Sequence, residues 1–167
     1  MSNFINTLDI LGDNAFSDAI LEGTLEELHD DTITHLTLSH FGGYTKLKSV
    51  NLPKLIGMGV HYFSDSTYLE SVSFSVITGL GTYQFNGCAK LTRLILRNTP
   101  SICTLSAVNC FTSTPIASGT GYIYVPRALV DSYKTATNWA TYANQFRALE
   151  DYTVDGTVTG EIDESKI

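Results

Sequence analysis

Residues 85–96 read FNGCAKLTRLIL, and they decide the fold because two similar stretches precede them at one spacing. Residues 63–74 read FSDSTYLESVSF and residues 41–52 read FGGYTKLKSVNL, so the stretches begin at the evenly spaced positions 41, 63 and 85. Apolar residues occupy the same four positions in all three. In the first stretch these positions are Phe41, Leu47, Val50 and Leu52. A fixed period of this length predicts a repeat array, in which each unit buries its apolar face against its neighbours.

Two short extended segments are expected in each repeat. From Ser49 onward, residues 47–52 alternate between polar and apolar, as a half-buried strand does. Residues 77–82 alternate as well, and their glycines allow a turn or close packing. Phe63 and Phe85 are expected to fill the corner between the two segments. We therefore predict a mainly β fold, a short solenoid of 22-residue repeats over residues 24–111.

A cap is expected where the repeat register ends. The column through Phe63 and Phe85 would next reach Ala107, but the phenylalanine is Phe111, which places a four-residue insertion within 101–110. Because solenoids need atypical ends, residues 112–149 are predicted to form a C-terminal cap of one strand and two helices, which makes the class α+β. The strand is expected at 121–126. The first helix buries Leu129, Tyr133 and Ala136, and the second is capped by Asn138 and buries Trp139, Tyr142, Ala143 and Phe146.

Charge is segregated along the chain. Residues 1–31 hold eight acidic and no basic residues, residues 32–149 hold nine basic and three acidic ones, and residues 150–167 hold six acidic and one basic. Residues 1–23 are predicted to be an acidic arm with a short helix at 16–21, and residues 150–167 an acidic extended tail. Asp30 and Asp31 replace an inward leucine, which indicates a partial first turn. No Lys/Arg cluster forms, so nucleic acid is not an expected partner.

Neither a membrane span nor a secreted disulfide framework is expected. No apolar run reaches the roughly 18 residues of a membrane helix, and the acidic start does not resemble an export signal. The three cysteines, Cys88, Cys103 and Cys110, are odd in number. This indicates that the thiols are reduced and that the chain is made in a reducing compartment. The alternative is a Cys103–Cys110 bridge.

No metal, cofactor or catalytic site is expected. The four histidines, His29, His35, His40 and His61, lack the third ligand that zinc requires at a supporting interval. No P-loop, dinucleotide-binding or nucleophile-elbow motif is present. A carbohydrate hydrolase would have to use Asp65, Glu70 or Asp131, which do not form a recognisable pair.

The outward residues of the first strand of each repeat form the candidate binding surface. They stack in three columns: Ser49, Ser71 and Arg93; Asn51, Ser73 and Ile95; Pro53, Ser75 and Arg97. His61 and Tyr83 project from the second segment. The candidate binding residues are Ser49, Asn51, His61, Ser71, Ser73, Ser75, Tyr83, Arg93, Ile95 and Arg97. Hydroxyls, an amide and guanidinium groups suit glycan or protein contact, although any solenoid needs polar residues on its outer side.

The run from Phe85 to Leu96 resembles the repeat of BspA-type leucine-rich-repeat proteins, whose pattern is roughly F-x-x-C-x-x-L-x-x-I-x-L-P. The resemblance covers about residues 24–111 and implies a leucine-rich-repeat solenoid. Tyr44 and Ser66 stand where the pattern has Cys, and only Pro53 keeps the proline.

The C-terminal region is similar to the ends of leucine-rich-repeat proteins encoded by phages and prophages of gut bacteria. The similar stretches are 114–126, 129–134, 138–139 and 153–160. This resemblance implies a virion accessory protein on the tail or capsid. It would be made in the host cytoplasm and would contact host-surface glycan or protein, or other virion proteins. The alternatives are an intracellular protein that binds and inhibits a host protein, and a bacterial surface adhesin. Edge strands and the Val/Thr tail also favour homo-oligomers through the termini.

Overall fold

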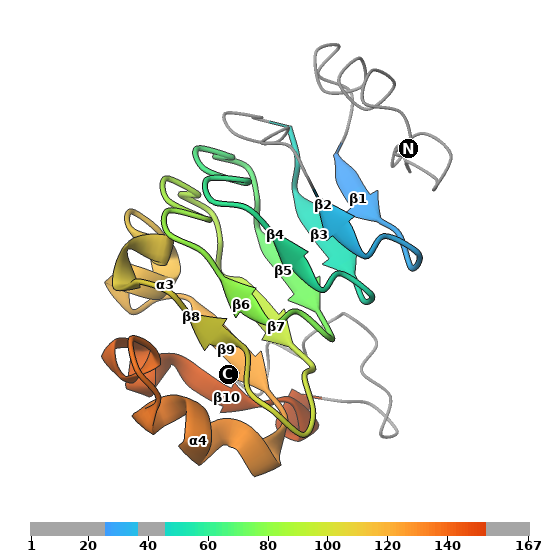
Figure 1. Ribbon diagram of the computed structural model, residues 1–167. Helices are drawn as coiled ribbons and strands as arrows, with labels where there is room; N and C mark the ends of the chain where they lie inside the picture. The colour runs from blue at the N-terminus through green and yellow to red at the C-terminus, as the bar shows by residue number, and fades with distance from the viewer. Residues whose placement is uncertain (1–25, 37–45, 153–167) are drawn as a thin grey trace.

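The chain folds around a six-stranded parallel sheet, seen in a computed structural model that describes residues 26–36 and 46–152 (Figure 1). The sheet order is β1-β3-β5-β7-β9-β10, and every neighbouring pair is parallel. The strands are β1 (Glu27–His29), β3 (Ser49–Leu52), β5 (Ser71–Phe74), β7 (Arg93–Leu96), β9 (Tyr122–Val125) and β10 (Phe146–Ala148).

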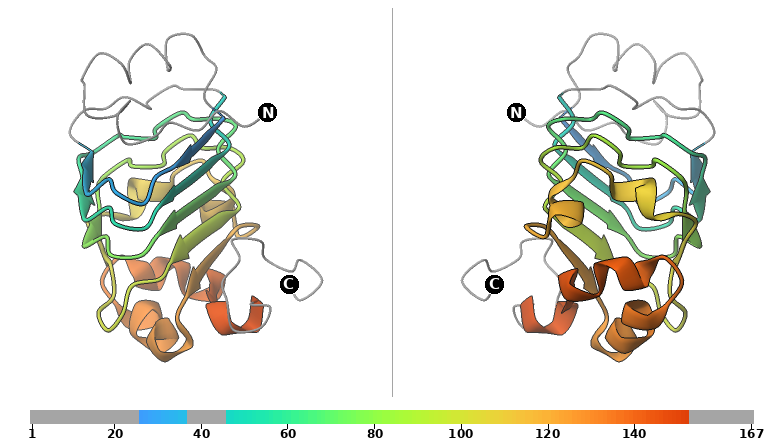
Figure 2. Two further views of the ribbon diagram at one scale, coloured as in Figure 1. Left: turned by 90° about the vertical axis from the view of Figure 1, so that its right-hand side faces the viewer. Right: turned by 90° about the vertical axis from the view of Figure 1, so that its left-hand side faces the viewer.

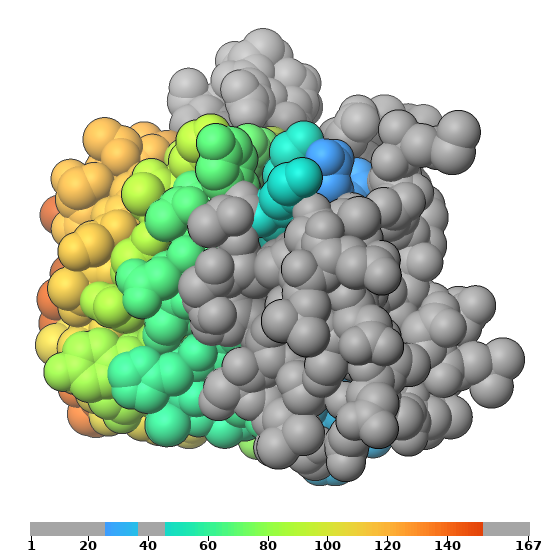
Figure 3. Space-filling model, turned by 90° about the horizontal axis from the view of Figure 1, so that it is seen from above, coloured from blue at the N-terminus to red at the C-terminus, as the bar shows by residue number. Residues whose placement is uncertain are grey.

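Four shorter strands form a second row on the other side of the core (Figure 2). They are β2 (His35–Leu36), β4 (Gly57–Met58), β6 (Gly79–Leu80) and β8 (Thr104–Leu105). β2 pairs with β4 and β6 with β8, both in parallel. The Thr78 N–H donates to the Ile56 carbonyl at 2.9 Å and links the two pairs. Seen from above, successive segments lie side by side in chain order (Figure 3).

The strand register agrees with the outward columns expected from the sequence. Ser49 pairs with Ser71, and Ser71 pairs with Arg93. One repeat period separates the partners in these pairs and in those of β1 with β3. The step then lengthens, because Arg93 pairs with Tyr122 and not with Pro115, where the regular period would place its partner. Part of the extra length precedes β8, because Gly79 of β6 pairs with Thr104 of β8, 25 residues later in the chain.

Three parallel phenylalanine rings form the corner of the core. The rings of Phe63 and Phe85 lie 5.6 Å apart and those of Phe85 and Phe111 lie 5.8 Å apart, each pair at 7°. All three side chains are fully buried. Phe111 therefore rejoins the column despite the insertion before it, because the Phe85 N–H donates to the Cys110 carbonyl at 2.9 Å.

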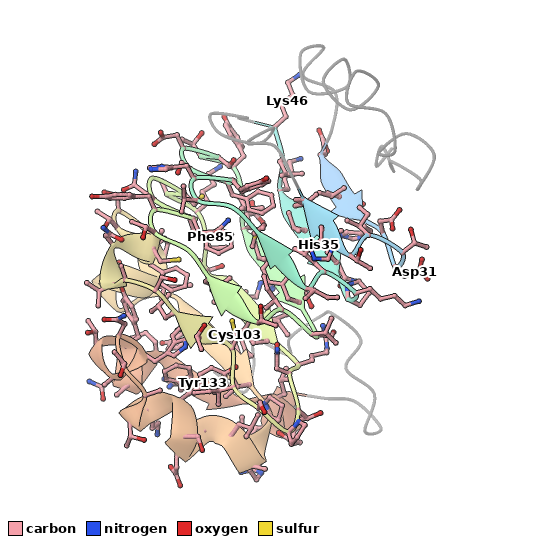
Figure 4. All side chains as sticks on the ribbon, viewed as in Figure 1. Asp31, His35, Lys46, Phe85, Cys103 and Tyr133 are labelled. Atoms are coloured by element: carbon pink, nitrogen blue, oxygen red, sulfur yellow. The ribbon has the colours of Figure 1, made fainter. Side chains whose placement is uncertain are left out.

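The cap closes one end of the array with short helices (Figure 1). They are η1 (Val108–Phe111), α3 (Pro115–Ser118), η2 (Arg127–Leu129), α4 (Val130–Thr135), η3 (Trp139–Gln145) and η4 (Leu149–Tyr152), the η elements being 3₁₀ helices. The backbone of Cys103 ties the insertion to this cap. The Cys103 N–H donates to the Tyr133 hydroxyl at 2.8 Å, and the indole N–H of Trp139 donates to the Cys103 carbonyl at 2.7 Å. Figure 4 shows Phe85, Cys103 and Tyr133 in the interior.

The strand expected at 121–126 is confirmed as β9, but the second cap helix was wrong in two respects. Phe146 does not continue a helix; it begins β10, where it pairs with Ile123 of β9. The preceding residues form 3₁₀ turns that kink at Tyr142. The Asn138 side chain does not cap them, because its amide donates instead to the Leu105 and Ser106 carbonyls at 2.8 and 3.1 Å.

At the other end, Asp30 organises the first described turn. Its Oδ1 accepts the Thr32 N–H, the Thr32 hydroxyl and the Ile33 N–H at 2.7–2.9 Å. The helix expected at 16–21 and the tail after residue 152 lie outside the described residues. Residues 150–152 belong to η4, so an extended tail does not begin at residue 150. Within the described ranges, no helix has the length and apolar character to cross a membrane.

Candidate functional site

The outward face of the large sheet holds a hollow of about 460 Å³, which we call the sheet groove. It spans four strands, β1, β3, β5 and β7. The groove is lined by Glu27, His29, Ser49, Val50, Asn51, Ser71, Ser73, Arg93, Ile95 and Arg97. Seven of the ten candidate binding residues therefore lie together here, six on the neighbouring strands β3, β5 and β7 and Arg97 just after β7.

Strand alternation makes the groove floor polar. Val50, Val72 and Leu94 point into the core, so the residues on either side of them point outward. Strands β3 and β5 thereby present Ser49, Asn51, Ser71 and Ser73 to the groove. The Ser49 hydroxyl lies 3.0 Å from Nε2 of His29 on β1. The floor can both donate and accept hydrogen bonds over several strands.

The β7 end of the groove is basic. Arg93 is half-buried at the start of the strand, and Arg97 is half-buried just after its end. Nη1 of Arg97 donates to the Ser73 hydroxyl, and the Arg97 backbone N–H donates to the Phe74 carbonyl at 2.9 Å. Burial lowers the pKa of the Arg97 guanidinium. Among the described residues, no carboxylate forms an ion pair with Arg97.

Ile95 is not the exposed contact residue that its column position predicts. It points to the outer side of the sheet, but its side chain is only 1% exposed. It packs with Tyr122, Tyr124 and Leu149 in a small apolar cluster on that side. β9 and the start of η4 supply this cover, so the groove ends at this apolar cluster beyond Arg93.

Three candidate residues lie elsewhere. Ser75 lines a separate hollow of about 280 Å³ that also includes Asn98 and Pro100. His61 and Tyr83 stack on each other with ring centroids 5.0 Å apart, and both have a positive φ, 61° and 55°. They form an exposed pair at the loop edge and do not line the groove.

Two groove residues, Glu27 and His29, were missed as binding candidates. They pair with Ser49 and Asn51 across β1 and β3. Stepping the outward columns back by one repeat period from Ser49 and Asn51 leads directly to them. The repeat spacing could therefore have identified both residues. Glu27 places one carboxylate at the end of the groove opposite the arginines.

The groove lining supplies hydroxyl, amide, guanidinium, imidazole and carboxylate groups. Nowhere in residues 26–36 and 46–152 do three His, Cys, Asp or Glu side chains gather as a metal site would require. The three cysteines are free and buried. Burial raises the pKa of the Cys88 and Cys103 thiols to about 12, which leaves them protonated and weak as nucleophiles.

Comparison with known proteins identifies the repeats. No curated protein sequence matches the chain. The model of the BspA type leucine rich repeat region matches residues 9–122 with six copies of the repeat. This match spans most of the chain and includes all four strands that line the sheet groove. The chain therefore belongs to the BspA-type leucine-rich-repeat family.

Proposed function

We propose that this protein is a non-enzymatic binding protein whose contact surface is the sheet groove. Its family membership indicates a protein-binding or structural role. We propose that its strands form a short solenoid of 22-residue repeats, and that the solenoid displays the groove. The observation that carries the proposal is that seven candidate residues, on three neighbouring strands of the sheet and just after the last of them, line one hollow.

We further propose that the chain is an accessory protein of a phage particle, made in the host cytoplasm and displayed on the tail or capsid. The groove would then contact a glycan or protein of the host surface. Support comes from the similarity of residues 114–126, 129–134, 138–139 and 153–160 to the ends of phage-encoded leucine-rich-repeat proteins.

Mass spectrometry of purified particles tests the virion role. We expect peptides of this chain at a fixed ratio to the major structural proteins. Particles carrying Arg93→Gln and Arg97→Gln together should attach more weakly to host cells than particles carrying Lys134→Gln, an exposed control on α4. Absence of the chain from particles would refute the virion role. If a pull-down from infected cells then returned one stoichiometric host protein, the alternative of an intracellular inhibitor would replace it.

A further inference from the structure

We infer that the basic end of the sheet groove binds the carboxylate of an acidic glycan. The subsite comprises the guanidinium groups of Arg93 and Arg97 and the hydroxyl of Ser71. Ser73 is only 6% exposed and accepts a hydrogen bond from Arg97. This inference rests on the proposed function of the groove as a binding surface, and it names the class of ligand.

Arg97 carries a charge that no described carboxylate pairs with. Its guanidinium has lost part of its hydration on a half-buried site, and Ser73 is its hydrogen-bonding side-chain partner. A hydroxyl does not neutralise the charge, whereas a guanidinium presents five donors in a fork that matches a carboxylate. A desolvated cation gains most from a charge-assisted hydrogen bond. Arg97 is thus prepared to receive an anion from outside the described chain.

Arg93 lines the same end of the groove as Arg97. It lies on the same side of the strand, four residues before Arg97, so the two Cα atoms are about 13 Å apart along an extended chain. Both side chains line the groove and are long enough to converge over it. Ser71 pairs directly with Arg93 across β5 and β7. One strand therefore presents two cations above a floor of hydroxyls.

The two ends of the groove differ in charge. Glu27 lies on β1, three strands away from β7, which corresponds to about 14 Å at the usual strand spacing. It repels an anion from that end while Arg93 and Arg97 attract it to the other. A ligand with one acidic end and several neutral hydroxyls fits this arrangement in a single direction.

The floor favours a glycan over a protein. Protein interfaces have apolar or aromatic anchors at their centre. The two apolar residues that line the groove, Val50 and Ile95, are only 2% and 1% exposed. The other lining residues offer hydroxyl, amide and guanidinium groups, with the His29 imidazole and the Glu27 carboxylate at the β1 end. The hydroxyl and amide groups pair with sugar hydroxyls, and the guanidinium groups pair with a sugar carboxylate. The volume of about 460 Å³ falls in the range of small-ligand sites and suits a short oligosaccharide.

Isothermal titration of the full-length chain tests this inference. The probes are trigalacturonic acid, its neutral methyl ester, α2,8-linked trisialic acid, and pentaglutamate as an acidic peptide. We expect at least one of the two acidic sugars to bind, and more tightly than pentaglutamate. If trigalacturonic acid is the one that binds, its methyl ester should bind at least tenfold more weakly. Arg97→Gln should weaken binding of the acidic sugar at least tenfold, and Lys134→Gln should leave it unchanged.

Two further variants keep the test decisive if Arg97→Gln does not fold. Arg93→Gln removes the other cation, and Ser71→Asp places a negative charge on the floor without removing an arginine. Either should weaken binding of the acidic sugar at least tenfold. Binding of neither acidic sugar, equal binding by the variants and the wild type, or binding of pentaglutamate alone would overturn the inference. The last result would indicate an acidic peptide as the ligand.

The attachment assay separates this inference from the proposed function. If particle attachment depends on Arg97 but no acidic glycan binds, the inference fails and the groove stands as a contact surface. If acidic glycan binds through Arg97 but attachment does not depend on it, the carboxylate subsite stands and the proposed role of the groove in host contact fails.

Discussion

The stacked rings of Phe63, Phe85 and Phe111 should contribute to stability beyond the apolar area they bury. Phe85 is the middle ring and is fully buried, with a parallel partner on each side. Phe85→Leu keeps an apolar side chain of similar size at this position but removes both ring pairs. The substitution therefore separates ring stacking from burial.

The expected loss follows from these two contacts. Aromatic pairs contribute about 0.5–1.5 kcal/mol each beyond their buried area, so two pairs contribute about 1–3 kcal/mol. The change of shape adds up to about 1.5 kcal/mol. We expect Phe85→Leu to lower the free energy of unfolding by about 1–4.5 kcal/mol, a large part of the stability of a domain of this size.

Urea unfolding followed by the fluorescence of Trp139 measures this loss. The control is Val76→Ala at a half-exposed position, which should change the free energy of unfolding by less than about 0.5 kcal/mol. Phe63→Leu and the double variant complete a cycle that isolates the pair. Its coupling energy should be about 0.5–1.5 kcal/mol. Additivity of the two substitutions within about 0.3 kcal/mol would refute the reasoning, because it would show that the rings do not stabilise each other.

Three further outcomes are expected from urea unfolding. Asp30→Ala should cost about 1–3 kcal/mol, because the buried Oδ1 accepts two backbone N–H groups and a hydroxyl; an unchanged midpoint would contradict this. Gly87→Ala should destabilise by at least about 1 kcal/mol, while Gly57→Ala should not. The reason is that φ is +77° at Gly87 and a Cβ there would overlap the Asp65 carboxylate, whereas a Cβ at Gly57 meets nothing within 4 Å. Burial raises the pKa of Cys88 and Cys103 from 9.0 to about 12, so the folded state holds these protons after the unfolded chain has lost them. The free energy of unfolding should be unaffected by these thiols below about pH 9 and should fall as the pH rises from 9 towards 12, a fall that replacing both cysteines by alanine should reduce.

The strand register could be predicted because buried apolar residues recur at one fixed spacing along the chain. A slip of one residue between β3 and β5 would turn Val72 out to solvent and Ser71 into the core, so the apolar columns specify the alignment. The same periodicity placed Ser49, Ser71 and Arg93 in one outward column.

The cap could be predicted only in part, because its buried side chains do not recur at a fixed spacing along the chain. Trp139 and Phe146 are both buried, as expected, with rings 5.7 Å apart. Their spacing is compatible with a helix, but the backbone forms 3₁₀ turns and then a strand. The decisive contact is with β9, whose free edge accepts β10, and no local pattern encodes that pairing.

The burial of Ile95 lay beyond sequence reasoning for a related reason. Its cover comes from Tyr124 and Leu149, which follow it much later in the chain, after the period has been broken. Only the fold of the cap shows that one outward column becomes apolar at this strand. The polar part of the groove, by contrast, depends on residues within the regular columns and could be predicted.

The groove has one closed end and one extendable end. The apolar cluster around Ile95 and Tyr124 closes the groove at the cap, and it fixes the position of Arg93 and Arg97 relative to the cap. On the other side, each additional 22-residue unit placed between β1 and β5 would lengthen the hydroxyl floor by one strand spacing, about 4.8 Å. The length of the bound ligand and the recognition of its charged end are therefore separable properties. Duplicating residues 49–70 should give a protein that binds a longer ligand and still recognises the same charged end of it.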